Sequence, residues 1–266
     1  MLFNSYAQKS KTTTADKKYD SYAYIKAVST YERVAEKGYK SEDMFQKLGN
    51  SYYFNGELDK AVKWYDELFK MNPNQESEYI YRYAQSLKAI GQNDKANQML
   101  ETFSQKAGND TRGKLFGKNK NYLEQIKANS GRYKIEDAGI NSKYSDYGSA
   151  FYNNKLVFSS ARDTGSLGQR KHTWTNQHFT NLYVSDLGEE MTPGKVNKFA
   201  DKINSKFNES TPVFTKDGKT MYFTRNNYLD GKKGKDANKV TLVKIYKASF
   251  EICREHSVNR IYSKSK

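Results

Sequence analysis

The chain of 266 residues is poor in the residue types that crosslink chains, bind metals or break helices. It contains one Cys, three His and three Pro. One Cys excludes an internal disulfide and any zinc cluster built on cysteines. No stretch is long and apolar enough to cross a bilayer, and the mean hydropathy is −0.97. These shortages remove disulfide scaffolds, Cys-based zinc domains and helical membrane proteins from consideration.

Tyrosine, phenylalanine and positive charge are plentiful. Hydrophobic residues make up only 36% of the chain, so 22 Tyr and 14 Phe must supply much of the apolar bulk. Tyr can be half buried with its hydroxyl in water, which suits a shallow core. The formal charge is +15, and Lys and Arg are spread along the chain. This composition predicts a basic, solvated surface and leaves attraction to a polyanion as an alternative.

The segment 45–73, FQKLGNSYYFNGELDKAVKWYDELFKMNP, predicts two helices joined by a turn. Its apolar, small and aromatic residues follow helical spacing along both halves. The dipeptide Asn55-Gly56 between the halves is a turn signal, and a final Pro cannot continue a helix. The packing signature of this hairpin is Phe45, Leu48, Gly49, Tyr52, Ala61, Tyr65, Leu68 and Pro73.

This signature resembles the tetratricopeptide repeat, a helix–turn–helix unit with a period of 34 residues. Ala27, Ala61 and Ala96 occupy one corresponding small position and are separated by 34 and 35 residues. The resemblance implies an α-solenoid of about three repeats over residues 8–129, in which the first repeat is degenerate. A closing amphipathic helix is expected from the last apolar cluster: Leu115, Phe116, Tyr122, Leu123 and Ile126.

Tetratricopeptide repeats bind other proteins and have no chemistry of their own. Their first helices line a groove, so the resemblance implies that these residues face it: Gln46, Asn50, Tyr53, Tyr81, Arg82, Gln85 and Lys88. Asn50 and Arg82 match only part of the clamp that some relatives use for C-terminal carboxylates. A helical ligand, an extended ligand and plain solvation of these side chains all remain open.

The second half changes from helical to strand-like patterning at about Arg132. AFYNNKLVFSSAR and PVFTKDGKTMYFTRNN each read as strand, turn and strand. Asn153-Asn154 and Asp217-Gly218 suit tight turns because these residues tolerate positive φ. Two aromatic pairs share a separation of 63 residues: Phe151 with Phe214, and Tyr183 with Tyr246. We therefore expect an internal repeat of two strands, a long loop and a third strand.

NESTPVFTKDGKTMYFTR looks like the blade motif of TolB-type and WD-like β-propellers, and YGSAFYNNKLVFSSAR is a weaker copy. The resemblance implies an incomplete β-propeller of about two blades over residues 132–250. The fold class expected for the whole chain is α+β and multidomain. We expect the strands LVFSS and MYFTR to lie at exposed sheet edges.

The two halves together resemble the N-terminal part of OmpA-family envelope proteins of Bacteroidetes, some of which are associated with type IX secretion and gliding. The resemblance implies an exported scaffold of the periplasm or outer membrane. Its partners would be envelope proteins, and a further domain of complete relatives would bring it near peptidoglycan. No nucleic-acid partner and no transmembrane segment are expected.

Both ends of the chain depart from this pattern. Residues 1–7 read as a possible remnant of a signal peptide, because Ser5-Tyr6-Ala7 before Gln8 resembles a cleavage site. A plain N-terminus is the alternative. The tail 251–266, EICREHSVNRIYSKSK, shows no blade pattern. A truncated or frameshifted gene and a genuine short paralogue both explain such an end.

The residues that could carry chemistry are few and scattered. His172 and His178 share a loop that offers no third metal ligand, whereas zinc needs three or four. Cys253 and His256 lack a third partner for nucleophilic catalysis. We therefore expect no enzyme, metal or cofactor, and a scaffold that binds proteins. The alternatives are a basic module for an anionic glycan or nucleic acid and, less favoured, a hydrolase built on the propeller.

Overall fold

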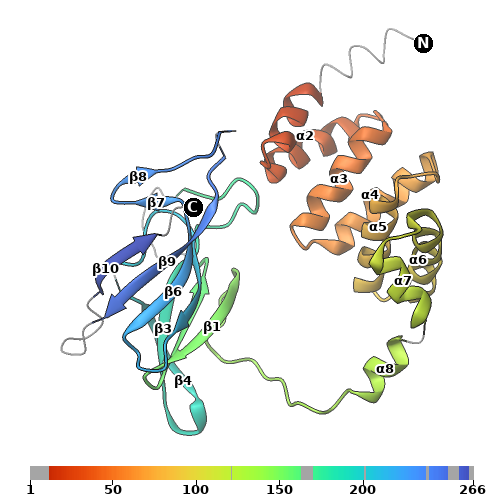
Figure 1. Ribbon diagram of the computed structural model, residues 1–266. Helices are drawn as coiled ribbons and strands as arrows, with labels where there is room; N and C mark the ends of the chain where they lie inside the picture. The colour runs from red at the N-terminus through yellow and green to blue at the C-terminus, as the bar shows by residue number, and fades with distance from the viewer. Residues whose placement is uncertain are drawn as a thin grey trace. The chain divides into compact units, whose positions relative to one another are not determined.

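The computed structural model describes residues 12–120, 122–162, 170–200, 202–237, 240–250 and 258–263. The chain forms two compact units. The helical unit runs to Lys134 and includes Thr173–Asn176, and the β unit contains the other residues (Figure 1). The expected signal remnant, residues 1–7, lies outside the described part of the chain.

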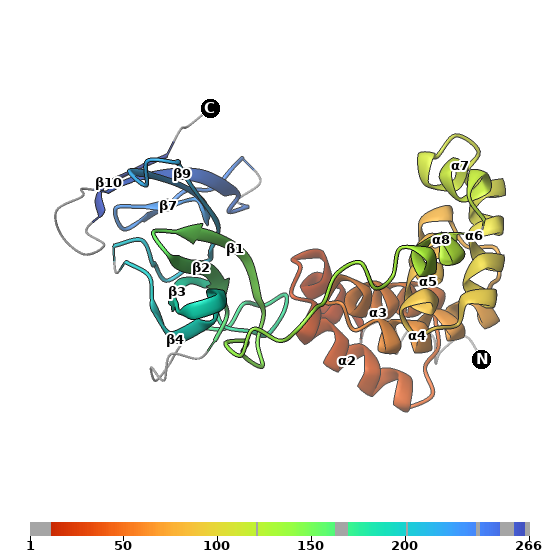
Figure 2. The same cartoon turned by 90° about the horizontal axis from the view of Figure 1, so that it is seen from below.

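Most consecutive helices of the helical unit pack side by side (Figures 1 and 2). Residues 12–20 are helical and precede the first labelled helix. The labelled helices are α2 Tyr24–Glu36, α3 Glu42–Phe54, α4 Leu58–Met71, α5 Ser77–Ala89, α6 Asn93–Ala107, α7 Thr111–Lys118 and α8 Tyr122–Ala128. The N-terminal part of the protein is therefore a helical repeat region.

Local sequence explains where these helices begin and end. Ser41 caps α3 because its Oγ accepts a hydrogen bond from the Met44 backbone N–H at 3.3 Å. Asp110 caps α7 in the same way, accepting from the Arg112 N–H at 2.8 Å. Gly56 and Gly91 follow α3 and α5 with φ of 74° and 78°, a conformation that glycine adopts without steric cost.

The packing signature lies in one continuous core. Its buried members are Phe45, Leu48, Gly49, Tyr52, Ala61, Tyr65 and Leu68. Pro73 is exposed and follows the end of α4. A Cβ atom at Gly49 would lie 2.4 Å from a ring carbon of Tyr65, which is fully buried. Because Gly49 of α3 has no side chain, the Tyr65 ring of α4 can pack directly against the α3 backbone.

The expectation of one closing helix is wrong, because the structure has two short helices, α7 and α8. Phe116 packs against the last repeat, but Leu115 and Ile126 are each 61% exposed. Asn119 separates the helices with an extended φ of −137°, and its N–H closes the last turn of α7. Gly117 and Asn119 are weak helix formers, so the longer helix is not sustained.

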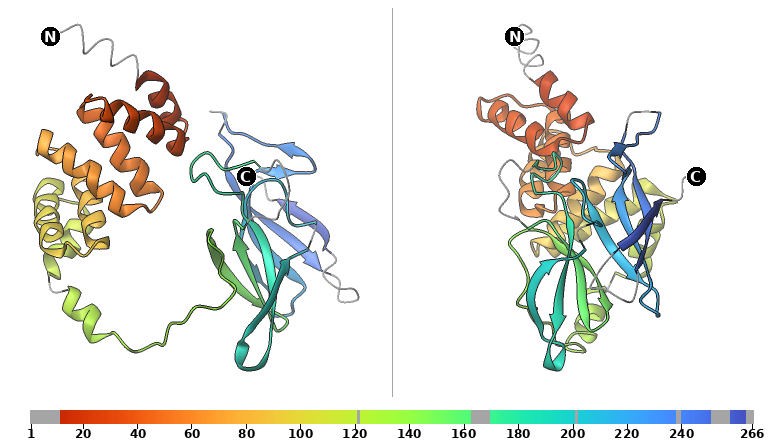
Figure 3. Two further views of the ribbon diagram at one scale, coloured as in Figure 1. Left: turned by 180° about the vertical axis from the view of Figure 1, so that it is seen from behind. Right: turned by 90° about the vertical axis from the view of Figure 1, so that its left-hand side faces the viewer.

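The β unit contains two four-stranded antiparallel sheets (Figure 3). The first sheet has the order β1 Asp146–Tyr152, β2 Lys155–Ser160, β3 Asn181–Leu187 and β4 Pro193–Lys198. The second has the order β10 Val258–Ser263, β9 Val243–Phe250, β6 Thr220–Asn226 and β5 Glu209–Phe214. A 3-10 turn at Glu189–Met191 and a small hairpin of β7 Tyr228–Leu229 and β8 Lys232–Lys233 lie in the connections.

Strand pairing confirms the internal repeat. Phe151 pairs with Leu156, and Phe214 pairs with Met221. Tyr183 and Tyr246 likewise occupy matching positions, opposite Phe158 and Phe223. The turn residues Asn153, Asn154 and Gly218 have positive φ, as the sequence predicts.

Two expectations about strands are wrong. LVFSS and MYFTR lie in β2 and β6, which are inner strands with a neighbour on each side. Each sheet also has a fourth strand that the patterning did not reveal. In the second sheet this strand is β10, from the tail that showed no blade pattern, and Ile261 pairs with Ala248. An edge strand such as β4, PGKVNK, is largely exposed, so it needs no apolar alternation.

The two sheets pack against each other around a shared core. The first sheet and the loop after it contribute Val157, Leu182, Phe199 and Ile203 to this core. The second sheet contributes Met221, Phe223, Tyr246, Ala248 and Phe250. The Tyr152 ring stacks on Phe214 with centroids 4.3 Å apart. The shared core makes the β unit one folded body.

Candidate protein-binding surface

The groove residues expected from the sequence lie on two helices. Gln46, Asn50 and Tyr53 belong to α3, whereas Tyr81, Arg82, Gln85 and Lys88 belong to α5. Gln46, Asn50 and Arg82 form polar contacts inside the helical unit, whereas Tyr81, Gln85 and Lys88 line a pocket at the end of the repeats. The Tyr53 ring packs against Phe54 and Arg82.

Asn50 forms hydrogen bonds inside the helical unit. It is buried, and its Oδ1 accepts from the Tyr65 hydroxyl and from Arg82 Nη1, each at 2.8 Å. Its Nδ2 donates to the Tyr19 hydroxyl at 3.0 Å. Burial raises the pKa of Tyr65, so its hydroxyl keeps its proton and acts as donor. These bonds join successive helices and occupy the amide that partly matched a carboxylate clamp.

The other polar side chains near Asn50 also have internal partners. Arg82 forms an ion pair with Glu78 at 3.3 Å, and its guanidinium lies 4.8 Å from the centre of the Phe54 ring. Gln46 Nε2 donates to Gln75 Oε1 at 2.8 Å. This part of the predicted groove therefore contributes to the cohesion of the repeats.

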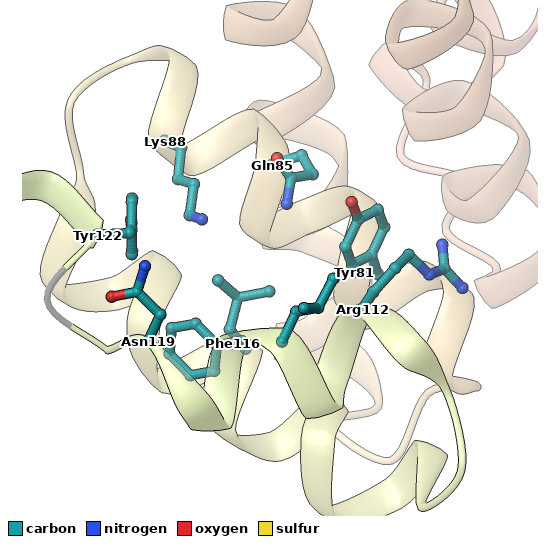
Figure 4. A pocket seen from close by; sticks show the side chains of 9 residues that line it. Tyr81, Gln85, Lys88, Arg112, Phe116, Asn119 and Tyr122 are labelled. Atoms are coloured by element: carbon teal, nitrogen blue, oxygen red, sulfur yellow. The ribbon is translucent and has the colours of Figure 1, made fainter. Parts of the chain in front are cut away.

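Tyr81, Gln85 and Lys88 line a pocket of about 320 Å³ (Figure 4). The pocket lies where the last repeat meets α7 and the start of α8. The remaining lining residues are Leu100, Arg112, Leu115, Phe116, Asn119 and Tyr122. In Figure 4, Lys88 and Gln85 on α5 face Phe116 and Asn119 across the pocket.

The pocket combines apolar walls with polar groups at fixed positions. Leu100 and Phe116 are buried and supply the apolar part. Arg112 lies 4.2 Å from the centre of the Tyr81 ring and pairs with Glu78 at 2.8 Å. The hydrogen bonds from Arg112 lower the pKa of Glu78, so this pair stays ionised at neutral pH. A small apolar pocket with a few polar groups is typical of binding sites.

Lys88 differs from Arg112, the other cation that lines the pocket, because it has no anionic partner among the described residues. Its Nζ lies 4.1 Å from the centre of the Tyr122 ring, and burial lowers the pKa of Lys88. By contrast, Lys95 pairs with Asp66 at 2.7 Å and Lys120 with Glu101 at 2.8 Å. The Gln85 amide likewise forms no hydrogen bond within the described chain. Both polar groups are therefore available to a ligand.

The sequence pointed to three pocket residues of α5 but missed the pocket. Leu115, Phe116 and Tyr122 were recognised as apolar residues of a closing helix, and Arg112 and Asn119 carried no signal. The break between α7 and α8 brings Asn119 and Tyr122 opposite Lys88. The signal that could have indicated this break is the run of Gly117 and Asn119 inside the expected helix.

The β unit contains a carboxylate–arginine pair twice, once in each sheet. Arg162 Nη2 lies 3.1 Å from Asp146 Oδ1, and Arg225 Nε lies 2.9 Å from Glu209 Oε1. Corresponding residues of the two pairs are 63 positions apart. The backbone N–H of Ser142 donates to Asp146, and that of Ser205 donates to Glu209. Each pair thus ties a sheet to the loop before it.

The two carboxyl groups differ in the direction of their pKa shift, because Glu209 is more deeply buried than Asp146. Burial tends to raise the pKa of Asp146, but hydrogen bonds from Ser160, Ser142 and Arg162 outweigh it, and the pKa is lowered. Glu209 is fully buried, and its burial raises its pKa to about 7 against the hydrogen bonds from Ser205 and Arg225. Neither carboxylate is open to a substrate, so we interpret both pairs as structural.

The histidine loop is held by local contacts. The backbone N–H of His172 donates to the Gln177 carbonyl at 2.8 Å. Lys171 and His178 form an isolated antiparallel β-bridge. The rings pack against Phe179 and Tyr144, and burial lowers the pKa of His172. In the described part of the chain, no three His, Cys, Asp or Glu side chains are grouped to hold a metal ion. Cys253 and His256 lie outside that part.

Of the helices that the structure describes, none has the length and apolar character to cross a membrane.

Neither a protein-family model nor a curated protein matches the sequence. Three solved structures are similar over about half of the chain. The C-terminal part of a TPR repeat-containing protein from Cytophaga hutchinsonii is 20% identical over 43% of this chain, with a TM-score of 0.37. The match spans 45% of the Cytophaga chain, which is less than half of its length.

The other two are the type III secretion translocator chaperone SycD of Yersinia enterocolitica and the Sgt2 TPR domain of Aspergillus fumigatus. SycD is 22% identical over 47% of this chain and 94% of its own, with a TM-score of 0.34. The Sgt2 domain is 14% identical over 52% of this chain and 91% of its own, with a TM-score of 0.37.

Proposed function

We propose that the protein is a non-catalytic scaffold that binds other proteins in the cell envelope, in the periplasm or at the outer membrane. The observation that carries this proposal is the pocket at the end of the helical repeats, where, among the described residues, Lys88 has no anionic partner and Gln85 has no hydrogen-bond partner. The tetratricopeptide signature supports protein binding. The OmpA-family resemblance of the sequence supports the envelope location and proximity to peptidoglycan.

We also propose that the two sheets are blades of a β-propeller. The argument comes from the internal repeat of 63 residues. The face that is buried in the first sheet corresponds to a face that is exposed in the second sheet. Leu182 is fully buried against the second sheet, whereas its counterpart Ile245, 63 positions later, is 66% exposed. Val213 and Tyr222, opposite each other on the same face, are 57% and 43% exposed. A propeller would cover this face with another blade.

The exposed face of the second sheet should promote self-association of the 266-residue chain. Ile245→Lys should reduce concentration-dependent association, because a charge would disrupt an apolar contact between chains. Ile135→Lys is the matched control, since Ile135 is 91% exposed and lies outside both sheets. Light scattering and sedimentation velocity measure the effect. Equal association of both variants and the parent would contradict the proposed role of this face.

The location is tested by fractionation of cells that carry the intact gene. We expect the product in the periplasm or the outer-membrane fraction, because the sequence resembles exported envelope proteins. Protease accessibility after permeabilising only the outer membrane gives an independent readout. Recovery from the cytosol alone would overturn the envelope location. The protein-binding proposal would then be supported by the pocket alone.

Protein binding is tested in the same cells with a photocrosslinking amino acid at Leu115, an exposed residue on the rim of the pocket. We expect crosslinks to a discrete protein, and none from the same amino acid at Ile135. Crosslinks to polysaccharide or nucleic acid would favour the alternative of a basic binding module, which the net charge of +15 suggests. Binding by that module should fall steeply as salt is raised.

A further inference from the structure

The pocket at the end of the helical repeats offers an unmatched positive charge beside an apolar wall. The Lys88 ammonium lies against the Tyr122 ring and has no carboxylate partner in the described chain. The Gln85 amide, one turn earlier on α5, faces the same space. Phe116 and Leu100 form the apolar wall. A ligand that places an anion and an apolar group close together would satisfy both parts.

The size of the pocket and the surface beside it restrict the kind of ligand further. A volume of about 320 Å³ is at the lower end for binding pockets, which suits the side chains of a peptide better than a large cofactor. Leu115 and Ile126 are each 61% exposed and extend apolar surface beyond the pocket. A segment that runs through the pocket would contact this surface on its way. The net charge of +15 also favours an acidic partner.

We propose that the pocket binds an internal peptide segment of a partner protein in which Asp or Glu lies close to a large apolar residue. The carboxylate pairs with Lys88 Nζ and accepts a hydrogen bond from the Gln85 amide. The apolar side chain packs on Phe116, Leu100 and Leu115. This inference rests on the proposed protein-binding function and names the chemistry of the segment bound.

An internal segment fits better than a C-terminal carboxylate. Asn50 and Arg82, the residues that partly match a carboxylate clamp, are bonded to each other at 2.8 Å. Arg112, the other cation of the pocket, is already paired with Glu78 and Asp110. Lys88 alone therefore supplies one unpaired charge, which matches one side-chain carboxylate on a passing chain.

The test measures binding of short peptides to the full chain by fluorescence anisotropy. The peptides are amidated at the C-terminus, labelled at the N-terminus, and carry Glu and Leu at several spacings. A matched set carries Gln in place of Glu. We expect at least one Glu peptide to bind about tenfold more tightly than its Gln match, the effect of one charged hydrogen bond.

Variants of the protein assign the effect to Lys88. Lys88→Met should remove the preference for Glu, and Lys88→Arg should keep most of it. Lys118→Met is the matched control, because Lys118 is an exposed residue of α7 that does not line the pocket. Lys88→Met should melt at or above the parent temperature, because it relieves the burial of a charge. Lost binding without a lower melting temperature then reports ligand contact rather than unfolding.

Each other outcome overturns the inference. It fails if every Glu peptide binds no better than its Gln match, or if Lys88→Met binds as the parent does. Gln peptides with a free C-terminus that bind through Lys88 would show that the pocket takes chain ends instead. The proposed protein-binding function is judged separately, because crosslinks from Leu115 to a protein would persist even if no acidic peptide bound.

Discussion

Tyr65→Ala should lower the free energy of unfolding of the helical unit by about 3–5 kcal/mol, because it empties a fully buried aromatic site. Gly49→Ala should cost about 1–3 kcal/mol for the opposite reason. Its new Cβ would lie 2.4 Å from the Tyr65 ring, which has no free space to move into. Urea denaturation followed by circular dichroism at the helix wavelength measures both effects.

The double variant and a distant glycine test the cause of these losses. Gly49→Ala with Tyr65→Ala should cost less than the sum of the single changes, because removing the ring makes room for the methyl group. Gly117→Ala is the control, since nothing lies within 4 Å of a Cβ at this position in α7. It should be neutral or stabilising. Additive losses, or a loss at Gly117 as large as at Gly49, would contradict the proposed contact.

Glu209→Ala should destabilise the β unit by about 3–5 kcal/mol, because it leaves the Arg225 guanidinium buried without its anion. Arg225 is only 4% exposed, so water cannot replace the carboxylate. Glu209→Gln should cost less, since the amide oxygen still accepts hydrogen bonds from Ser205 and Arg225. Amide hydrogen exchange in β6 and β9 measures the loss within this unit of the full chain.

The repeat provides an internal comparison for this prediction. Asp146→Ala removes the corresponding carboxylate of the first sheet, but the Arg162 side chain is 18% exposed and can contact water. We therefore expect a smaller loss than for Glu209→Ala. Replacing both members of the buried pair, Glu209→Leu with Arg225→Met, should recover much of the stability. Equal losses at Asp146 and Glu209 would show that burial does not set the effect.

The helical unit contains both polar groups that stabilise the fold and polar groups that are available to a ligand. Asn50, predicted to face a ligand, is buried and bonded to Tyr65 and Arg82. Lys88, on the same predicted surface, contacts the Tyr122 ring but has no anionic partner in the described chain, and burial lowers its pKa. A partly buried charge without an anionic partner is a better candidate for binding than a polar group that completes a packed network.

The sequence by itself determined the local features whose causes are local. The spacing of small and aromatic residues indicated the helical hairpins and the close approach at Gly49, because helical periodicity decides which side chains share a face. The offset of 63 residues indicated the repeated sheet, and Asn and Gly at the turns indicated where the strands reverse. These features depend on residues that are near each other along the chain.

Tertiary structure alone decided the features that join distant residues. The fourth strands β4 and β10 are edge strands held by backbone pairing, which leaves little trace in side-chain pattern. The carboxylate–arginine pairs join a loop to a strand across the sheet. The pocket exists because α7 ends at Lys118 and α8 turns Tyr122 toward Lys88, residues 34 positions apart in the chain. Such contacts form where packing brings segments together, and no periodicity within one segment records them.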